Sequence, residues 1–253
     1  MSANYHVTHL YPDQMSIYGD YGNILTLKYF CERIGLNFIY QPIGIGQELP
    51  EITHLYFFGG GQDKEQMLIY PDLLTKQARI ADDLLVKNIG MLAICGGYQA
   101  LGSEFITGQN QAIPGLKILP VTTSAPNSNI TSRAIGNLVV ESEFFGTTLI
   151  GFENHSGQTY FVDSDIKCQP IGKVLVGYGN NMEEGLEGCI YGNIIGTYMH
   201  GPILPKNPEI TKWLITRTAS LDAKQLHKLQ NLDTSLESKT RLELVKHFTK
   251  NLK

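Results

Sequence analysis

The sequence lacks long apolar runs and has no excess of positive charge. It contains no stretch of about 18 consecutive apolar residues, so we expect no transmembrane helix. Lys and Arg total 20 against 24 Asp and Glu, and the formal net charge is -4, which argues against broad electrostatic binding of nucleic acid. The opening residues MSANYHVTHLYPDQ lack a basic segment followed by an apolar one, so we expect no signal peptide. These absences predict a cytoplasmic protein.

The usual metal and nucleotide motifs are also missing. The four cysteines are widely spaced and form no C-x-x-C pair, which argues against a zinc site and a disulfide framework: Cys31, Cys95, Cys168 and Cys189. Neither G-x-x-x-x-G-K-[ST] nor G-x-G-x-x-G occurs, so no nucleotide-phosphate loop is expected. We therefore expect no metal and no cofactor in this chain.

The first half of the sequence alternates strand and helix patterns. With 42% hydrophobic and 17% charged residues among 253, the chain can bury a sizeable core. Strands are expected at Tyr5–Leu10, Leu36–Tyr40, His54–Phe58 and Gly90–Ile94. Helices are expected at Gly22–Gly35, at Asp63–Asn88 with a possible break at Pro71, and from Gly96 to about Leu101. The alternation predicts an α/β fold with an open, mostly parallel twisted sheet flanked by helices.

The second half reads as shorter strands followed by helices. Strands are expected at Arg133–Glu141, Thr148–Phe152, Val174–Gly177, Gly188–Tyr191 and Ile194–Met199, and helices at Pro208–Ala219 and Ser235–Leu252. The polar stretch Thr122–Ser132 is the best loop or linker candidate. We expect a main domain over residues 1–220 and a loosely attached C-terminal helical extension over 221–253.

A cysteine stands where the strand Gly90–Ile94 meets the next helix. The order strand, Cys95, Gly96, Gly97 and helix is the layout of a nucleophile elbow, with glycines that permit the sharp turn. The positive end of the helix dipole favours a thiolate at Cys95, and the backbone N–H of Gly96 would point toward a developing oxyanion. The competing interpretation is a small buried core cysteine.

A thiolate nucleophile needs a histidine partner, and one histidine ends an apolar strand. His200 follows that strand and precedes a Gly-Pro break, where ligand sites gather in α/β sheets. His155, also close to a strand end, is its rival. A hydrogen-bonded structural imidazole is the alternative for either residue.

A glycine triplet, Gly59–Gly61, follows the strand LYFF. Backbone N–H groups of such a turn can face a carbonyl oxygen, so Gly60 is a candidate second oxyanion donor beside Gly96. A merely flexible turn would have the same sequence. Asp20 and Asn23, near the start of the first helix, are expected to cap it.

Taken together, these residues resemble a class I, triad-type glutamine amidotransferase domain of flavodoxin-like fold. Ile94-Cys-Gly-Gly-Tyr-Gln99 resembles the family's nucleophile elbow, Gly59–Gly61 its oxyanion strand and His200 its base. The resemblance implies that Cys95 attacks the side-chain amide of glutamine. It also implies that Gln99 and Gly61 help to hold the substrate. Arg133 matches the family's substrate-binding arginine; without the resemblance, a surface ion pair would be preferred for it.

The sequence departs from the family where a glutamate often follows the base. Position 202 is Pro instead, and the absence of the glutamate resembles the cobyric-acid-synthase-like branch. Within this branch, the segments IYGDYGNI, YFFGGGQDKEQ, ICGGYQALG, GFENHSGQTY, GYGNN and GTYMHGPILPKNPEIT resemble the glutaminase subunits of lipid II isoglutaminyl synthases (GatD-type). The resemblance suggests that a partner subunit donates an Asp to orient His200. Glu209 is a candidate within this chain.

The resemblance also implies a partner and a pathway. Such a subunit hydrolyses glutamine and passes ammonia to a Mur-ligase-like synthetase subunit (MurT-type), giving an expected heterodimer. The partner carries ATP and magnesium and amidates the D-glutamate α-carboxyl of the peptidoglycan stem peptide. The expected location is cytoplasmic, with access to the inner face of the membrane through the lipid-linked substrate of the complex.

Three other functions remain open at the level of sequence. One is a cobyrinate-type amidotransferase glutaminase, although about 250 residues without a P-loop leave no room for its synthetase domain. Another is a catalytically silent scaffold that only binds a ligase. The last is a cysteine peptidase on a related sheet, which Gln99 and Arg133 fit less well than an amino-acid amide hydrolase.

Overall fold

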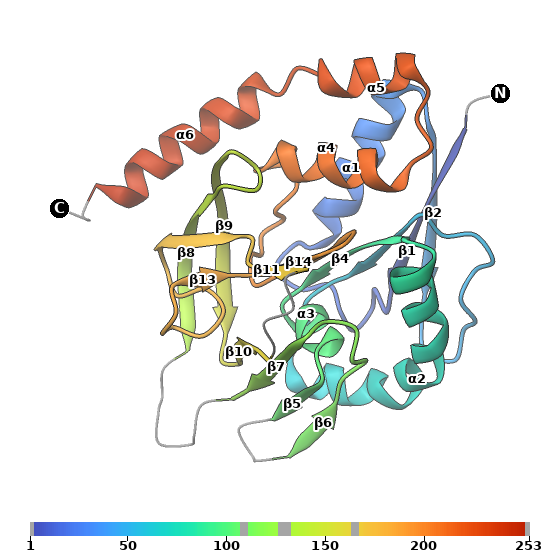
Figure 1. Cartoon of the computed structure of the whole chain (residues 1–253), viewed down its shortest axis with the longest axis vertical. Coiled ribbons are helices and arrows are strands. Elements are labelled where there is room, and N and C mark those ends of the chain that lie inside the picture. Colours follow the sequence, from blue (N-terminus) through green and yellow to red (C-terminus); the bar gives the residue numbers. More distant parts are fainter. Residues whose placement is uncertain (1–2, 107–110, 126–132, 163–166, 251–253) are drawn as a thin grey trace.

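A parallel sheet forms the centre of the molecule (Figure 1). The structure is a computed structural model and describes residues 3–106, 111–125, 133–162 and 167–250. Within these residues the sheet has seven strands in the order β11-β14-β15-β4-β3-β1-β2. They are β1 (Asn4–Leu10), β2 (Asn37–Ile43), β3 (Leu55–Phe58), β4 (Gly90–Ile94), β11 (Cys168–Gln169), β14 (Cys189–Tyr191) and β15 (Ile194–Thr197). The five strands from β2 to β15 are parallel, and β14 and β11 add an antiparallel edge. The predicted α/β class is confirmed.

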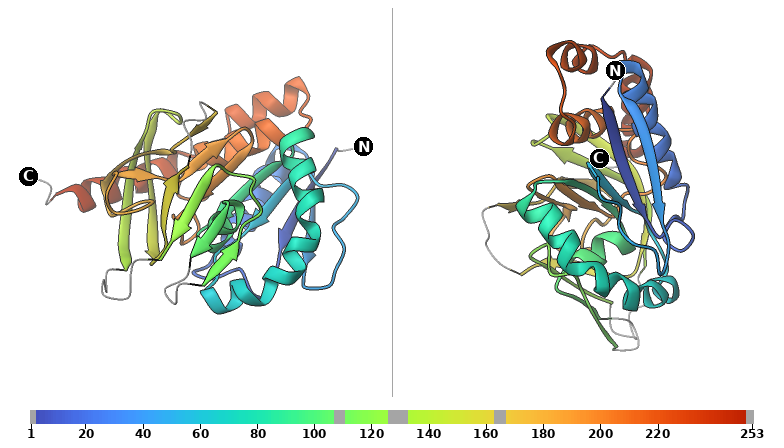
Figure 2. Two further views of the ribbon diagram at one scale, coloured as in Figure 1. Left: turned by 60° about the horizontal axis from the view of Figure 1, so that its bottom comes forward. Right: turned by 90° about the vertical axis from the view of Figure 1, so that its right-hand side faces the viewer.

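Helices cover both faces of this sheet. The helices are α1 (Tyr21–Ile34), α2 (Asp63–Ala81), α3 (Gly96–Leu101), α4 (Pro208–Thr218), α5 (Ala223–Gln230) and α6 (Ser235–Thr249). Figures 1 and 2 show α1 and α4 on one face and α2 and α3 on the other. The apolar strands β3 and β4 are completely buried between these layers, as a parallel sheet covered on both faces requires.

Two smaller sheets extend the second half of the chain. One runs β10-β7-β5-β6, formed by β5 (Glu104–Ile106), β6 (Ala112–Pro114), β7 (Val121–Ser124) and β10 (Gln158–Phe161). The other runs β13-β12-β8-β9, formed by β8 (Ala134–Ser142), β9 (Thr147–His155), β12 (Gly172–Val176) and β13 (Leu186–Glu187). Its long β8–β9 hairpin confirms two predicted strands, and Figure 2 shows it standing beside the central sheet.

Several predicted boundaries change. Strand β7 begins the stretch that we expected to be a loop, and residues 126–132 of that stretch lie outside the described residues. Helix α2 passes through Pro71 without a break and continues into a π-helical turn, Asp82–Val86. Pro71 lies on the exposed side of α2, where neighbouring turns can accommodate its ring. Strands β5, β6 and β10 and helix α5 were not predicted, because each is short.

The C-terminal segment contains two packed helices rather than one loose helix. Leu229 of α5 is completely buried, and α5 packs against α1 and α4. Helix α6 lies against β8, β9 and β12, and its Arg241 forms an ion pair with Glu209 of α4. None of the helices in the described part of the chain is long and apolar enough to span a bilayer. The boundary proposed at residue 220 stays a prediction.

Candidate active site

Cys95 occupies a strained turn between β4 and α3. Its backbone φ of 48° and ψ of -104° fall in a region that residues other than glycine rarely adopt. The turn is held by a hydrogen bond of 2.7 Å from the Cys95 N–H to the carbonyl of Thr197 on the neighbouring strand. A Cβ on Gly97 would lie 2.5 Å from the Phe58 carbonyl oxygen, so this close approach requires glycine. The predicted nucleophile-elbow geometry is present.

His200 lies just beyond β15, the strand next to β4. An isolated antiparallel bridge to Phe152 fixes its backbone, with both N–H···O bonds formed, and its side chain is fully buried. Burial disfavours the imidazolium, but the negative charge of Cys95 and the hydrogen bond with Asp20 outweigh it. Together they raise the pKa of His200 to about 10. Protonated His200 beside the cysteine can therefore supply a proton at neutral pH.

The carboxylate beside His200 comes from Asp20 of the same chain. The Asp20 Oδ1 atom lies 3.4 Å from His200 Nδ1, and both side chains are fully buried. The prediction that Asp20 caps α1 is wrong, because its side chain makes no capping hydrogen bond. Asn23 does not cap this helix either; its Oδ1 accepts the Leu204 N–H at 3.0 Å. The Asp20 side chain, at the start of α1, therefore contacts His200 instead of capping the helix.

Glu209, the other candidate within the chain, is directed elsewhere. Its Oε1 accepts a hydrogen bond of 2.8 Å from Arg241 Nη2. Burial alone would raise the pKa of Glu209, but hydrogen bonds from Arg241 outweigh it and lower that pKa. The structure does not support this candidate role for Glu209, because its carboxylate is paired with Arg241 of α6.

The glycine triplet contributes differently from our expectation. The Gly60 N–H donates to Asp20 Oδ2 at 2.7 Å, so it is not directed at an oxyanion. Gly60 instead gives His200 room, since a Cβ there would lie 2.5 Å from His200 Cε1. Gly61 lines the cavity with Cys95. Neither the Gly61 N–H nor the Gly96 N–H has an acceptor among the residues that the structure describes. These two groups are the better oxyanion donors.

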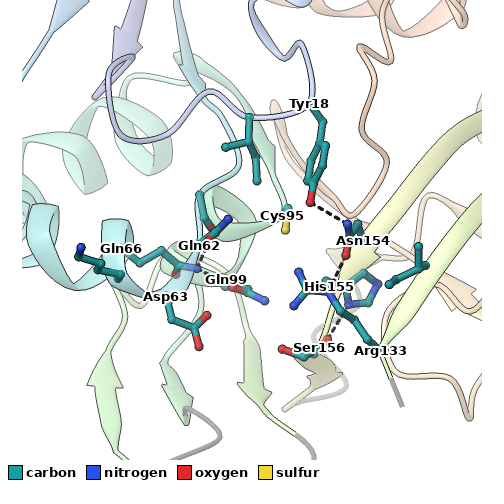
Figure 3. A pocket seen from close by; sticks show the side chains of 15 residues that line it. Tyr18, Gln62, Asp63, Gln66, Cys95, Gln99, Arg133, Asn154, His155 and Ser156 are labelled. Atoms are coloured by element: carbon teal, nitrogen blue, oxygen red, sulfur yellow. Dashed lines mark hydrogen bonds between the residues drawn. The ribbon is translucent and has the colours of Figure 1, made fainter. Parts of the chain in front are cut away.

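A cavity of about 520 Å³ opens above Cys95 (Figure 3). Its walls come from both halves of the chain: Ile17, Tyr18, Gly61, Gln62, Asp63, Lys64, Gln66, Cys95, Gln99, Arg133, Ile135, Asn154, His155, Ser156 and Gly157. The structure thus brings Cys95, Gln99, Arg133 and Gly61 together, as the resemblance implied. A free amino acid fits within such a volume.

Arg133 is held at the exposed rim of this cavity. Its Nε donates to Asn154 Oδ1 at 2.5 Å, and Asn154 Nδ2 donates to the Tyr18 hydroxyl at 2.7 Å. The Tyr18 ring packs edge-on against His200, with 5.0 Å between ring centroids. Figure 3 shows this row of side chains leading from Arg133 toward the region above Cys95. Sequence reasoning missed Asn154 and Tyr18, because nothing in their local sequence marks them.

Gln99 lies at the base of the cavity within a buried hydrogen-bond network. Its Oε1 accepts from Gln66 Nε2 at 3.1 Å, and its Nε2 donates to the Tyr198 hydroxyl at 3.2 Å. The Tyr198 hydroxyl in turn lies 2.6 Å from Thr159 Oγ1. The network fixes the carboxamide of Gln99 in one orientation toward the substrate space.

His155 also lines the cavity, but its surroundings are those of a structural residue. Its ring stacks on Tyr198 with 3.7 Å between centroids. Its Nδ1 lies 2.8 Å from the Gly157 carbonyl oxygen, and its Nε2 lies 3.6 Å from Glu153 Oε2. The imidazole therefore supports the Gln99 network and the turn after β9, while His200 holds the position beside the nucleophile.

The other cysteines lie in different environments. Burial raises the pKa of Cys31, which sits in the core. Cys168 and Cys189 face one another with 2.9 Å between their sulfur atoms, and this contact and burial raise the pKa of Cys189. Among the described residues, no group of three or more His, Cys, Asp or Glu side chains is arranged to hold a metal ion.

The family is decided by comparison with known proteins. The family model of the CobB/CobQ-like glutamine amidotransferase domain matches residues 6–208. The chain is a member of that family. Cys95, His200, Asp20 and Arg133 all lie within the matched region of this glutamine amidotransferase.

Curated relatives support the same family assignment. The chain is 40% identical over 212 residues to the GatD subunit of the glutamine-hydrolysing lipid II isoglutaminyl synthase of Streptococcus pneumoniae, covering 83% of this chain and 78% of the relative. It is 37% identical to the GatD subunit of Staphylococcus aureus, covering 83% of each. A probable cobyric acid synthase of Methanothermobacter thermautotrophicus is 34% identical over 133 residues, which is 48% of this chain and 25% of that protein.

Solved structures support the fold. A crystal structure of a glutamine amidotransferase has a TM-score of 0.55 at 14% identity, covering 83% of this chain and 98% of that one. A glutamine amidotransferase from Thermotoga maritima has a TM-score of 0.50 at 19% identity, covering 96% and 93%. The fold predicted from the sequence is confirmed by these structures.

Proposed function

We propose that this chain is the glutaminase subunit of a lipid II isoglutaminyl synthase. It would hydrolyse L-glutamine to glutamate and ammonia through a thioester on Cys95. The observation that carries the proposal is Cys95 at the wall of the cavity, with the buried pair of His200 and Asp20 beside it, in a chain 40% identical to a glutamine-hydrolysing GatD subunit. The GatD relatives match most of their own length, whereas the cobyric acid synthase match covers a quarter of the longer protein.

Binding places the glutamine amide above the nucleophile. The guanidinium of Arg133 is positioned at the rim to take the α-carboxylate, with Asn154 holding its Nε. Gln99 faces the substrate from below, and its hydrogen bonds with Gln66 and Tyr198 prevent it from turning away.

The first chemical step is attack by the Cys95 sulfur on the amide carbon. The negative charge moves to the amide oxygen, where the N–H groups of Gly61 and Gly96 are free to donate. Each donor of this kind contributes about 3 kcal/mol to the transition state. Because Gly60 donates to Asp20 instead, it acts on the histidine and not on the oxyanion.

His200 then moves the protons. Its pKa of about 10 keeps it protonated at neutral pH, so it donates to the departing nitrogen as the C–N bond breaks. The neutral imidazole next removes a proton from water, which attacks the thioester and releases glutamate. Asp20 holds the imidazole orientation through Nδ1 during both transfers.

A Mur-ligase-like partner would consume the ammonia. We propose that ATP and magnesium bind on that subunit, which amidates the D-glutamate α-carboxyl of the lipid-linked stem peptide. The resemblance had suggested that the partner also donates an Asp beside His200. Since Asp20 lies at Nδ1, the proposal places the orienting carboxylate in this chain and only the amidation on the partner.

The test is glutamate release by the full chain, alone and together with the Mur-ligase-like subunit. We expect activity that disappears in Cys95→Ser, by at least about 1000-fold, and in His200→Ala. His247→Ala, on the exposed part of α6, is the matched control and should retain activity. Partner-dependent release would support the heterodimer. No release in either setting by the folded chain would contradict the proposal and favour a ligase-binding scaffold.

A further inference from the structure

Two opposite charges face each other across the cavity. Asp63 begins α2 and Arg133 precedes β8, and both line the cavity that contains Cys95. Figure 3 shows them on opposite sides, with Gln99 between them. Burial raises the pKa of Asp63, and the positive charge of Arg133 works in the opposite direction.

The Asp63 carboxylate has no side-chain partner in the described part of the chain. Within the described residues it forms no ion pair within 4.0 Å, and the hydrogen bond that acts on it comes from its own backbone N–H. Arg133 donates from Nε to Asn154, and its outer nitrogen atoms make no hydrogen bond to any residue that the structure describes, so they are available to the cavity. A carboxylate and a guanidinium thus stand on opposite walls, with the substrate space between them.

Glutamine carries the matching charges on one carbon atom. When its side-chain amide lies above Cys95, its α-carbon extends away from the nucleophile, with an ammonium group and a carboxylate directed to different sides. An anion on one wall and a cation on the other complement such a zwitterion.

We propose that Asp63 binds the α-ammonium group of the substrate opposite Arg133, and thereby restricts the site to free α-amino acid amides. This inference rests on the proposed glutamine hydrolysis and adds a specificity-determining residue to it. An amide without the ammonium group would leave the Asp63 charge unpaired on binding, which penalises that amide.

The experiment compares two reagents that alkylate a cysteine nucleophile in the full chain. The glutamine analogue 6-diazo-5-oxo-L-norleucine carries the α-ammonium and α-carboxylate, whereas iodoacetamide carries neither. We expect Asp63→Asn to slow the reaction of Cys95 with the analogue by about 10–100-fold. The iodoacetamide rate should stay unchanged. Asp63→Glu should recover part of the loss, and Asp82→Asn, a surface carboxylate paired with Lys87, is the matched control.

A substrate comparison gives a second readout. In the active complex, the wild type should prefer L-glutamine over glutaramate, its analogue without the α-ammonium group. Asp63→Asn should reduce that preference by a similar factor, through KM for L-glutamine and with kcat little changed.

The outcomes separate this inference from the proposed function. Wild-type rates with the analogue in Asp63→Asn would overturn the inference, and so would an equal slowing with both reagents, which marks a purely structural role for the first turn of α2. If the wild type itself neither reacts with the analogue nor hydrolyses glutamine, while iodoacetamide labels Cys95, the proposed function fails instead.

Discussion

The two halves of the site are built from different kinds of sheet. Cys95 and His200 follow adjacent strands of the buried parallel sheet, and each has its backbone tied to a neighbouring strand. Asn154 belongs to β9 and Arg133 immediately precedes β8, so both lie at one end of the β8–β9 hairpin, near solvent. The reacting groups are therefore fixed by the core, while the recognition groups stand on an edge that faces the substrate.

This difference has a physical reason. Proton transfer and nucleophilic attack lose rate when the groups are displaced by a fraction of an ångström, so they benefit from a fully packed surrounding. Binding a charged amino acid requires groups that can be hydrated before the ligand arrives. Burying an unpaired guanidinium would destabilise the free protein by several kcal/mol, which is about the binding free energy that the ligand's carboxylate could supply.

The largest expected effect lies on the parallel-sheet side. Asp20→Asn removes the charge beside His200 Nδ1 while preserving the shape of the side chain. We expect kcat for glutamine hydrolysis to fall by about 100- to 10,000-fold. Since Asp20 helps to raise the pKa of His200 to about 10, the alkaline limb of the pH–rate profile should also move to lower pH. An unchanged kcat would contradict this role of Asp20 and would indicate that a carboxylate of the partner subunit orients His200.

The next effect concerns the contact between the parallel sheet and the sheet that contains the β8–β9 hairpin. Glu187 of β13 is fully buried, and its Oε1 accepts hydrogen bonds from Thr197 Oγ1 and the Tyr198 N–H at the end of β15. Burial raises the pKa of Glu187 from 4.5 to about 7. Its contribution to stability is therefore complete below about pH 4.5 and is lost as the pH rises through 7.

Glu187→Gln tests this contribution. The amide keeps the accepting oxygen and cannot ionise, so at pH 8 the variant should be more stable to unfolding by urea than the wild type. The expected difference is about 1–3 kcal/mol, and it should shrink toward pH 5. An equal pH dependence in both proteins would mean that Glu187 is not the titrating group.

A smaller effect is expected on the hairpin side. Asn154→Ala frees the Arg133 guanidinium without removing it and breaks the contact with the Tyr18 hydroxyl. KM for glutamine should rise by about 3–10-fold, because a hydrogen bond to a charged group is lost, and kcat should change less. A fall in kcat alone would show that Tyr18 acts on His200 more than Arg133 acts on the substrate.

The smallest effect lies farthest from the chemistry. Arg241→Met removes the ion pair of α6 with Glu209, whose side chain is 31% exposed and can be rehydrated. The unfolding free energy should fall by about 0.5–1 kcal/mol, with glutaminase activity unchanged. A large loss of activity would indicate that α6 has a role at the site itself.

Features of the site that are contiguous in the sequence could be predicted, whereas contacts between distant segments could not. The elbow at Cys95 depends on a strand, two glycines and a helix that are contiguous, so its local pattern is visible. Asp20 meets His200 across 180 residues of sequence, and before a helix it looks like a cap. Asp63 resembles an ordinary first-turn acidic residue that favours the helix dipole.

Other differences arise from packing. The Gly60 N–H could be assigned only after Asp20 was placed, because a glycine turn can direct its N–H groups several ways. Pro71 remains within α2 because its ring lies on the exposed side. The small strands form through pairing, β5 with both β6 and β7 and β10 with β7, and segments this short do not reveal it in the sequence.

The most direct test of the account is to trap the covalent intermediate. The full chain, mixed with L-glutamine and the Mur-ligase-like subunit, is quenched in acid and analysed by peptide mass spectrometry. We expect a glutamyl adduct on the peptide that contains Cys95, and no adduct in His200→Ala, because His200 protonates the departing nitrogen when the thioester forms. Glutamate release with no adduct at Cys95, or an adduct on another cysteine, would contradict it.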